Sequence, residues 1–79
     1  MRNDYVTDRF GDYLRKRREA AKLSQSALGN LVGVHSSVIW KWENQARFPT
    51  LGSFALVATA FGEDASDFLA SLKSGVEDG

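Results

Sequence analysis

One short segment of the chain gathers groups that can exchange hydrogen bonds with a ligand. Its members are His35, Ser36, Ser37, Trp40 and Lys41. They offer an imidazole, two hydroxyls, an indole N–H and an ammonium group, and no carboxylate stands between them. Groups of this kind can contact base edges and phosphate oxygens, so the chemistry that this set suits is contact at the rim of a DNA groove.

Two short amphipathic helices joined at a glycine are expected to position this set. The apolar residues with helical spacing are Leu28, Leu31 and Val32, followed by Val38, Ile39 and Trp42. The spacing predicts helices over 25–32 and 36–43, each burying one stripe. Gly33 stands between them, and glycine readily takes the left-handed conformation of a tight turn. The outer face of the second helix is then free to meet a partner.

Three more helices are expected around this pair, which makes the chain all-α. Helical spacing and capping residues predict them over 9–21, 51–60 and about 64–73. Residues 1–8 are predicted to form an N-terminal arm and residues 74–79 a flexible tail. The predicted N-terminal caps are Thr7 or Asp8, Ser24, Thr50, and Asp64 or Ser66. The apolar residues expected to face inward are Phe10, Leu14, Ala21, Leu51, Phe54, Ala55, Ala58, Phe61, Phe68, Leu69 and Leu72.

The composition narrows the class of protein. A hydrophobic content of 43% over 79 residues fits one small globular domain. There is no cysteine, which excludes disulfides, thiolate metal sites and a cysteine nucleophile, and a reducing cytoplasm is the expected compartment. No apolar run approaches the roughly 20 residues that a membrane span needs, so no membrane association is expected.

The chain is poor in the histidine and cysteine residues that catalysis and metal binding often use. The chain has one histidine, no cysteine and no glycine-rich phosphate loop, so we expect neither an enzyme nor a cofactor. No second histidine and no cysteine could complete a metal site at His35. The acidic residues Glu63, Asp64 and Asp67 are expected to favour the positive end of the last helix rather than to hold a metal ion.

The charge of the chain is uneven along its length, although the net charge is zero. Residues 1–47 hold nine Lys and Arg against five Asp and Glu, a net charge of +4. Residues 48–79 hold one against five, a net charge of −4. Because local fields decide where a polyanion docks, the first half of the chain is the expected side for nucleic acid.

A set of landmark residues runs without a gap between Phe10 and Leu69. They are Arg18, Gln25, Leu28, Gly29, Gly33, Ile39, Trp42, Glu43, Asn44, Pro49, Thr50, Leu51, Phe54, Ala58, Phe61 and Gly62. Together they resemble the Cro and phage-repressor type of helix-turn-helix family, also called XRE-like. The resemblance implies a compact five-helix domain of the lambda-repressor-like type over 9–73, with the helix-turn-helix formed by the second and third helices. Lys22 and Gln45 stand where the family often has glycine, so both are expected to have positive φ.

The resemblance also implies roles for the exposed residues of the helix pair. Positions carried over from the family place Ser36, Ser37 and Lys41 at base edges. Trp40 lies beside them and can contact a thymine methyl group or a sugar. The residues implied at DNA phosphates are Gln25, His35, Asn44 and Arg47.

Two implied contacts hold the pair rigid. Arg18 and Glu43 resemble a buried or half-buried ion pair that fixes the first helix against the end of the third. Gly29, where the family usually has alanine, is small enough to let two helices cross closely.

The function that the resemblance implies is that of a DNA-binding transcriptional regulator, in the form of a repressor. It is expected to act as a homodimer on a palindromic stretch of double-stranded DNA. The dimer contact is expected in the region of the fifth helix, from Phe68, Leu69 and Leu72. The protein is expected to be cytoplasmic and encoded by a bacterium or a phage.

Three alternatives stay open at this point. The same fold serves as a protein-interaction adaptor or as an antitoxin-type module with weak or no DNA binding. Ser36 and Ser37 can act as caps of the second helix of the pair rather than as base contacts. Trp40 can face a protein partner instead of DNA.

Overall fold

Five helices make up the secondary structure. The computed structural model describes residues 4–78, with side chains over residues 9–74. In chain order the helices are α1 (Asp4–Ala20), α2 (Gln25–Val32), α3 (Ser36–Glu43), α4 (Leu51–Ala60) and α5 (Ala65–Asp78). No strand is present in this part of the chain, so the predicted all-α fold is confirmed, and α2, α3 and α4 have the predicted bounds.

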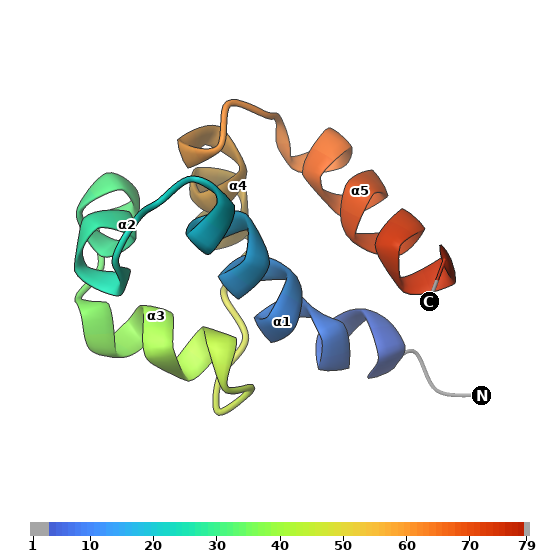
Figure 1. The fold of residues 1–79 in the computed structure, drawn as a ribbon, viewed down its shortest axis with the longest axis horizontal. Coiled ribbons are helices and arrows are strands. Elements are labelled where there is room, and N and C mark those ends of the chain that lie inside the picture. The colour runs from blue at the N-terminus through green and yellow to red at the C-terminus, as the bar shows by residue number, and fades with distance from the viewer. Residues whose placement is uncertain (1–3, 79) are drawn as a thin grey trace.

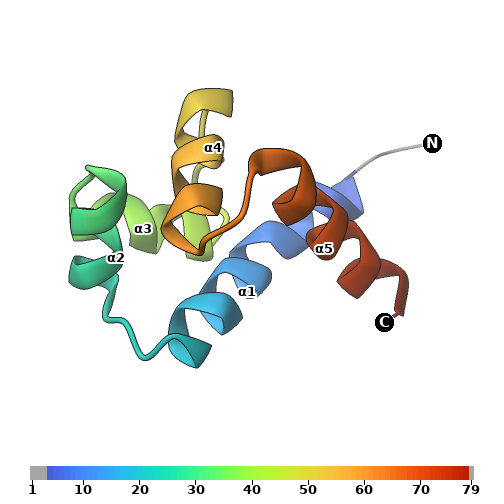
Figure 2. The ribbon, with the colours of Figure 1, turned by 90° about the horizontal axis from the view of Figure 1, so that it is seen from above.

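The helices surround one core. α1 and α5 pack side by side, and α2 packs against both α3 and α4. In Figure 1, α3 lies along the lower edge of the molecule and α4 lies at the back, seen nearly end-on. Figure 2, the view from above, shows the first turns of α4 projecting beyond its neighbours. The outer side of α3 therefore faces away from the other four helices.

The first helix begins earlier than predicted. It starts at Asp4 instead of residue 9, so Thr7 and Asp8 lie inside the helix and do not cap it. No proline or glycine interrupts residues 4–10, and aspartate is favourable near the positive end of a helix. The predicted arm over 1–8 is thus helical from residue 4, and residues 1–3 lie outside the described part of the chain.

The last helix ends later than predicted. It reaches Asp78, so residues 74–78 of the predicted tail are helical, and residue 79 lies outside the described part. The extra part of the helix includes Gly75, although glycine disfavours a helix interior. That preference amounts to about 1 kcal/mol relative to alanine, which does not end a helix already anchored in the core by Leu72.

Local signals at the other helix ends are confirmed. The side chains of Ser24, Thr50 and Asp64 each accept a hydrogen bond from the backbone N–H three residues on, at 3.0, 3.1 and 2.9 Å. Gly33 ends α2 in the left-handed conformation at φ 90°.

The two departures from the family pattern are also accommodated as predicted. Lys22 has φ 61° and Gln45 has φ 63°. A non-glycine residue in this region is strained by roughly 1–2 kcal/mol. Both residues lie in turns next to the helix pair, where the chain takes a left-handed conformation without glycine.

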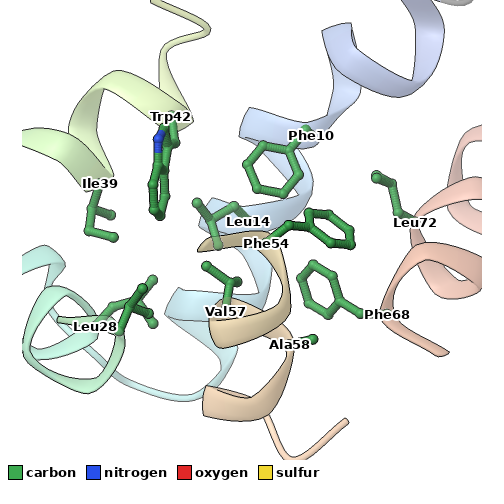
Figure 3. Packing of buried hydrophobic residues seen from close by; sticks show 11 residues of the cluster. Phe10, Leu14, Leu28, Ile39, Trp42, Phe54, Val57, Ala58, Phe68 and Leu72 are labelled. Atoms are coloured by element: carbon green, nitrogen blue, oxygen red, sulfur yellow. The ribbon is translucent and has the colours of Figure 1, made fainter. Parts of the chain in front are cut away.

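Side chains from all five helices meet in the core, as Figure 3 shows. The buried members are Phe10, Leu14, Leu28, Val32, Ile39, Trp42, Phe54, Val57, Ala58, Phe68 and Leu72. The ring centroid of Phe68 lies 5.3 Å from that of Tyr13 and 5.4 Å from that of Phe54, so aromatic contacts tie α5 to α1 and α4. Val57 was absent from the predicted set and is fully buried.

Several apolar residues predicted to face inward are exposed instead. Leu31, Leu51 and Leu69 are 58%, 82% and 39% exposed. Each has helical spacing to core residues but lies at the edge of the buried stripe of its helix, where no described helix covers it. Ala21 is exposed because α1 ends one residue before it.

The dimer contact expected from the fifth helix is wrong for two of its three residues. Phe68 and Leu72 are 0% and 1% exposed because both are used by the core of one chain. Of the three, Leu69 alone remains at the surface.

Candidate nucleic-acid interface

Four exposed residues form one stripe along α3 and its C-terminal end, which we call the α3 stripe: Ser37, Trp40, Lys41 and Asn44. Their spacing of three and four residues places them on one side of the helix. The opposite side carries the buried residues Ile39, Trp42 and Glu43. The α3 stripe therefore presents a hydroxyl, an indole, an ammonium group and an amide on the outer edge of the fold.

His35 caps α3 and extends the α3 stripe at its N-terminal end. Its Nδ1 accepts a hydrogen bond from the backbone N–H of Ser37 at 3.0 Å and lies 3.0 Å from Oγ of the same residue. The alternative in which Ser36 or Ser37 caps the helix is therefore wrong. In a neutral imidazole, an accepting Nδ1 leaves the proton on Nε2, so the exposed ring offers an N–H donor.

The residues expected at phosphates differ in how free their side chains are. Gln25 Nε2 donates to Glu43 Oε1 at 3.1 Å, which draws this amide toward the core side of α3. Asn44 Nδ2 donates to the carbonyl oxygen of Trp40 at 2.9 Å. Arg47 is exposed, its backbone N–H donates to the carbonyl oxygen of Lys41 at 3.3 Å, and its guanidinium has no hydrogen-bond or ion-pair partner among the described residues. Arg47 is thus the phosphate candidate whose charge is free.

Arg18 and Glu43 join α1 to the end of α3. Arg18 Nε donates to Glu43 Oε2 at 2.6 Å, and Nη2 donates to Oε1 at 3.1 Å. The third nitrogen, Nη1, donates to the carbonyl oxygen of Leu23 at 2.9 Å. The side chains are 12% and 1% exposed, and the hydrogen bond to Glu43 raises the pKa of Arg18 above its usual value despite the opposing effect of burial.

This pair removes the acidic charge from the surface of the helix pair. Glu43 is the only acidic residue in residues 24–47. Because it is buried against Arg18, the surface of this segment exposes no carboxylate. Lys41 and Arg47 are exposed on the same segment, so its local potential is positive although the chain is neutral overall.

The basic run at residues 15–18 is engaged mainly within the fold. Arg15 pairs with Asp12 at 2.7 Å, and Arg17 pairs with Glu63 at 2.9 Å. The last member of the run forms the buried pair described above. Lys16 is the one member without an ion pair in the described part of the chain. The run is therefore not a continuous patch for a polyanion.

Two glycines let α3 approach its neighbours closely. A Cβ at Gly29 would lie 2.5 Å from the carbonyl oxygen of Val34, so even alanine requires a shift of the backbone. A Cβ at Gly11 would clash with the backbone carbonyl of Glu43, where α1 crosses the end of α3. The sequence prediction missed Gly11. Its only signal was a glycine inside a helical pattern, which indicates close packing without naming the partner.

Neither a metal-binding cluster nor a membrane-spanning helix is found among the residues that the structure describes. No group of three or more His, Asp or Glu residues is placed there to hold a metal ion. No helix of this part is long and apolar enough to cross a membrane.

The chain also matches a known protein family over most of its length. Residues 9–69 match a family model described as a helix-turn-helix domain. The match runs from α1 into α5 and includes the whole α3 stripe and the Arg18–Glu43 pair. No curated protein matches the chain.

Proposed function

Since this chain belongs to the helix-turn-helix domain family, we propose that it is a sequence-specific regulator of transcription that binds double-stranded DNA. The observation that carries the proposal is the α3 stripe. It offers hydrogen-bond donors on an exposed helix whose one acidic residue, Glu43, is buried and neutralised. A surface of this kind favours a polyanion and can discriminate between base edges.

Base readout comes from α3, which enters the major groove by its N-terminal end while α2 lies across the backbone. Lys41 donates to guanine O6 and N7, and the hydroxyl of Ser37 serves as donor or acceptor. Ser36 is half-buried at the first position of α3, so the base that it contacts is one that lies at the N-terminal end of the helix. Trp40 packs against a thymine methyl group or a sugar at the rim of the groove.

Phosphate contacts fix the position of α3 in the groove. The proposed set is His35 through Nε2–H, Arg47 through its guanidinium, and Gln25 and Asn44 through their second amide N–H. The N-terminus of α2, next to Gln25, adds backbone N–H groups and the positive end of the helix dipole. These contacts supply affinity, while the α3 stripe supplies sequence preference.

The proposed regulator acts as a homodimer on a palindromic operator, with half-sites about one helical turn, roughly 34 Å, apart. Bound to its operator, the dimer occupies DNA that polymerase would otherwise contact, so its proposed effect is repression. Its place of action is the bacterial cytoplasm, where such DNA lies.

A salt titration of binding to random-sequence duplexes tests the proposal. The logarithm of the association constant is expected to fall linearly with the logarithm of salt concentration, with a slope of about −0.9 per phosphate neutralised. Lys41 and Arg47 are the cations available on the described helix pair, so a slope of a few units is expected for a dimer. If a verified dimer binds no duplex at low salt, the proposal is wrong.

That negative result would favour a second function, a protein-interaction adaptor or antitoxin-type module. The observation in its favour is Trp40, whose side chain is 51% exposed on the α3 stripe. An exposed aromatic side chain of this kind is typical of protein interfaces as well as of contacts at the rim of a DNA groove.

Lys41 and Arg47 are expected to act differently on DNA. Lys41→Ala is expected to relax base preference at one position of each half-site, at a cost of about 1–3 kcal/mol if the contact is bidentate. Arg47→Ala is expected to weaken binding to all sequences alike and to reduce the salt slope by about 1 per half-site. Selection of bound sequences from a random pool, followed by titration of single-base variants, separates the two. A uniform loss for Lys41→Ala would reassign this residue to phosphate.

A further inference from the structure

The outer face of α4 carries no charged residue. It consists of Leu51, Gly52, Ala55, Leu56 and Thr59, which share one side of the helix through spacings of three and four. We call this set the α4 face. The whole helix, LGSFALVATA, lacks Asp, Glu, Lys and Arg. Its opposite side carries the core residues Phe54, Val57 and Ala58.

Two leucines on the α4 face are strongly exposed. Leu51 is 82% exposed and Leu56 is 51% exposed, although a surface helix normally turns polar residues to water. Gly52 and Ala55 between them are small, and no atom lies within 4 Å of the point where a Cβ on Gly52 would stand. Another helix can therefore approach the backbone of α4 closely, with leucine side chains at its flanks.

We infer that the α4 face is covered by the α4 face of a second copy of this chain, in a two-fold dimer. The inference rests on the proposed function, because a palindromic operator calls for two copies. In a two-fold contact the same patch serves both partners, so any charge on it would lie near its own copy. An uncharged patch avoids that repulsion and suits self-association.

The charges at the two ends of α4 favour an antiparallel arrangement. The chain just before α4 carries the exposed Arg47 and the chain just after it carries the exposed Asp64, while Glu63 beside Asp64 is already paired with Arg17 of its own chain. A helix of this length spans about 15 Å, so antiparallel packing brings the basic end of one copy beside the acidic end of the other. The two helix dipoles are then also opposed, which is the favourable orientation.

The same arrangement keeps both copies of α3 on one side of the dimer. α3 lies along the lower edge in Figure 1, while the axis of α4 runs from front to back, as Figure 2 shows. We place the two-fold axis of the proposed dimer vertically in the view of Figure 1, because this direction makes the two α4 helices antiparallel and keeps both α3 helices at the lower edge. Both α3 stripes can then face one duplex.

The mass of the free protein in solution tests this inference without DNA. The chain has a mass of 8.7 kDa, and we expect sedimentation equilibrium to give twice that value. Leu56→Asp places two carboxylates in the contact and is expected to raise the dimer dissociation constant by about 100-fold or more. Leu69→Asp, at an exposed position of α5, is the matched control and is expected to leave the dimer dissociation constant unchanged. Circular dichroism checks that both variants remain folded.

Cross-linking gives a second readout that does not depend on weakening α4. The chain has no cysteine, so single substitutions report unambiguously. At least one of Ala55→Cys, Leu56→Cys and Thr59→Cys is expected to form a disulfide dimer on mild oxidation, because a residue near the axis lies within the roughly 4.4–6.8 Å Cα separation that a disulfide needs. Leu69→Cys, oxidised under the same conditions, is expected to stay monomeric.

Three outcomes would overturn the inference: a wild-type chain that stays monomeric at millimolar concentration, a dimer dissociated by Leu69→Asp but not by Leu56→Asp, or cross-linking at residue 69 and at none of the α4 positions. A dimer through α4 that binds no duplex would leave the α4 contact standing and overturn the proposed function instead.

Discussion

Replacing Arg18 by methionine is expected to destabilise the domain by about 3–5 kcal/mol, because the change leaves a buried carboxylate without its cation. Glu43 is 1% exposed, and after the substitution the amide of Gln25 is its one remaining side-chain donor among the described residues. A domain of 79 residues is stable by roughly 4–12 kcal/mol in total, so a loss of this size removes a large fraction of its stability. Urea unfolding followed by circular dichroism measures the effect.

The double variant Arg18→Met/Glu43→Leu is the control for this result. It removes both charges, so it is expected to recover most of the lost stability and to come close to the wild type or exceed it. The free energies of the wild type, the two single variants and the double variant form a cycle that isolates the pair. If Arg18→Met alone costs less than about 1 kcal/mol, the pair behaves like a solvent-exposed one and does not hold α1 to α3.

Local signals were sufficient to predict the middle of the fold. The bounds of α2 and α4 follow from Ser24, Gly33 and Thr50, whose effects act within one helical turn. The outer ends of α1 and α5 have no comparable stop, so a prediction from local preference placed them several residues too far inward. Both helices run outward from residues buried in the core, Phe10 in α1 and Leu72 in α5, and such burial is a tertiary property that a single helix pattern does not contain.

Helical periodicity predicts a stripe but not the helix that covers it. Leu28 and Leu31 lie three residues apart, which is a helical spacing, yet the first is fully buried and the second is 58% exposed. The difference depends on where α3 and α4 cross α2, which is a property of the tertiary structure. Leu51 and Leu69 were misplaced for the same reason, and Leu51 became part of the α4 face.

The sequence predicted which residues form the candidate site but not the contacts that they make with one another. The spacing of Ser37, Trp40 and Lys41 sufficed to place them on one exposed side of α3. The cap formed by His35 was missed because histidine is not a preferred capping residue, whereas two serines stood next to it. The contact of Gln25 with Glu43 joins residues 18 positions apart, and no local pattern indicates it.

Replacing Gly11 by alanine is expected to destabilise the domain by about 3 kcal/mol, at the upper end of the usual range for overpacking. A Cβ there would clash with the carbonyl oxygen of Glu43 and lie 2.8 Å from its carbonyl carbon and 2.9 Å from the carbonyl oxygen of Trp42. These are backbone atoms, which cannot rotate aside as a side chain can. The gain of about 1 kcal/mol in helix propensity from glycine to alanine is too small to offset the clash.

Gly52→Ala is the matched control, because Gly52 also lies inside a helix but has no atom within 4 Å of its Cβ position. It is expected to stabilise the domain by about 0.5–1 kcal/mol through propensity alone. Thermal unfolding at low protein concentration, where self-association contributes least, is expected to show opposite signs for the two substitutions. If both substitutions stabilise the domain equally, α1 and α3 cross with more room than the structure shows. The position of the α3 stripe is then held by the Arg18–Glu43 pair alone.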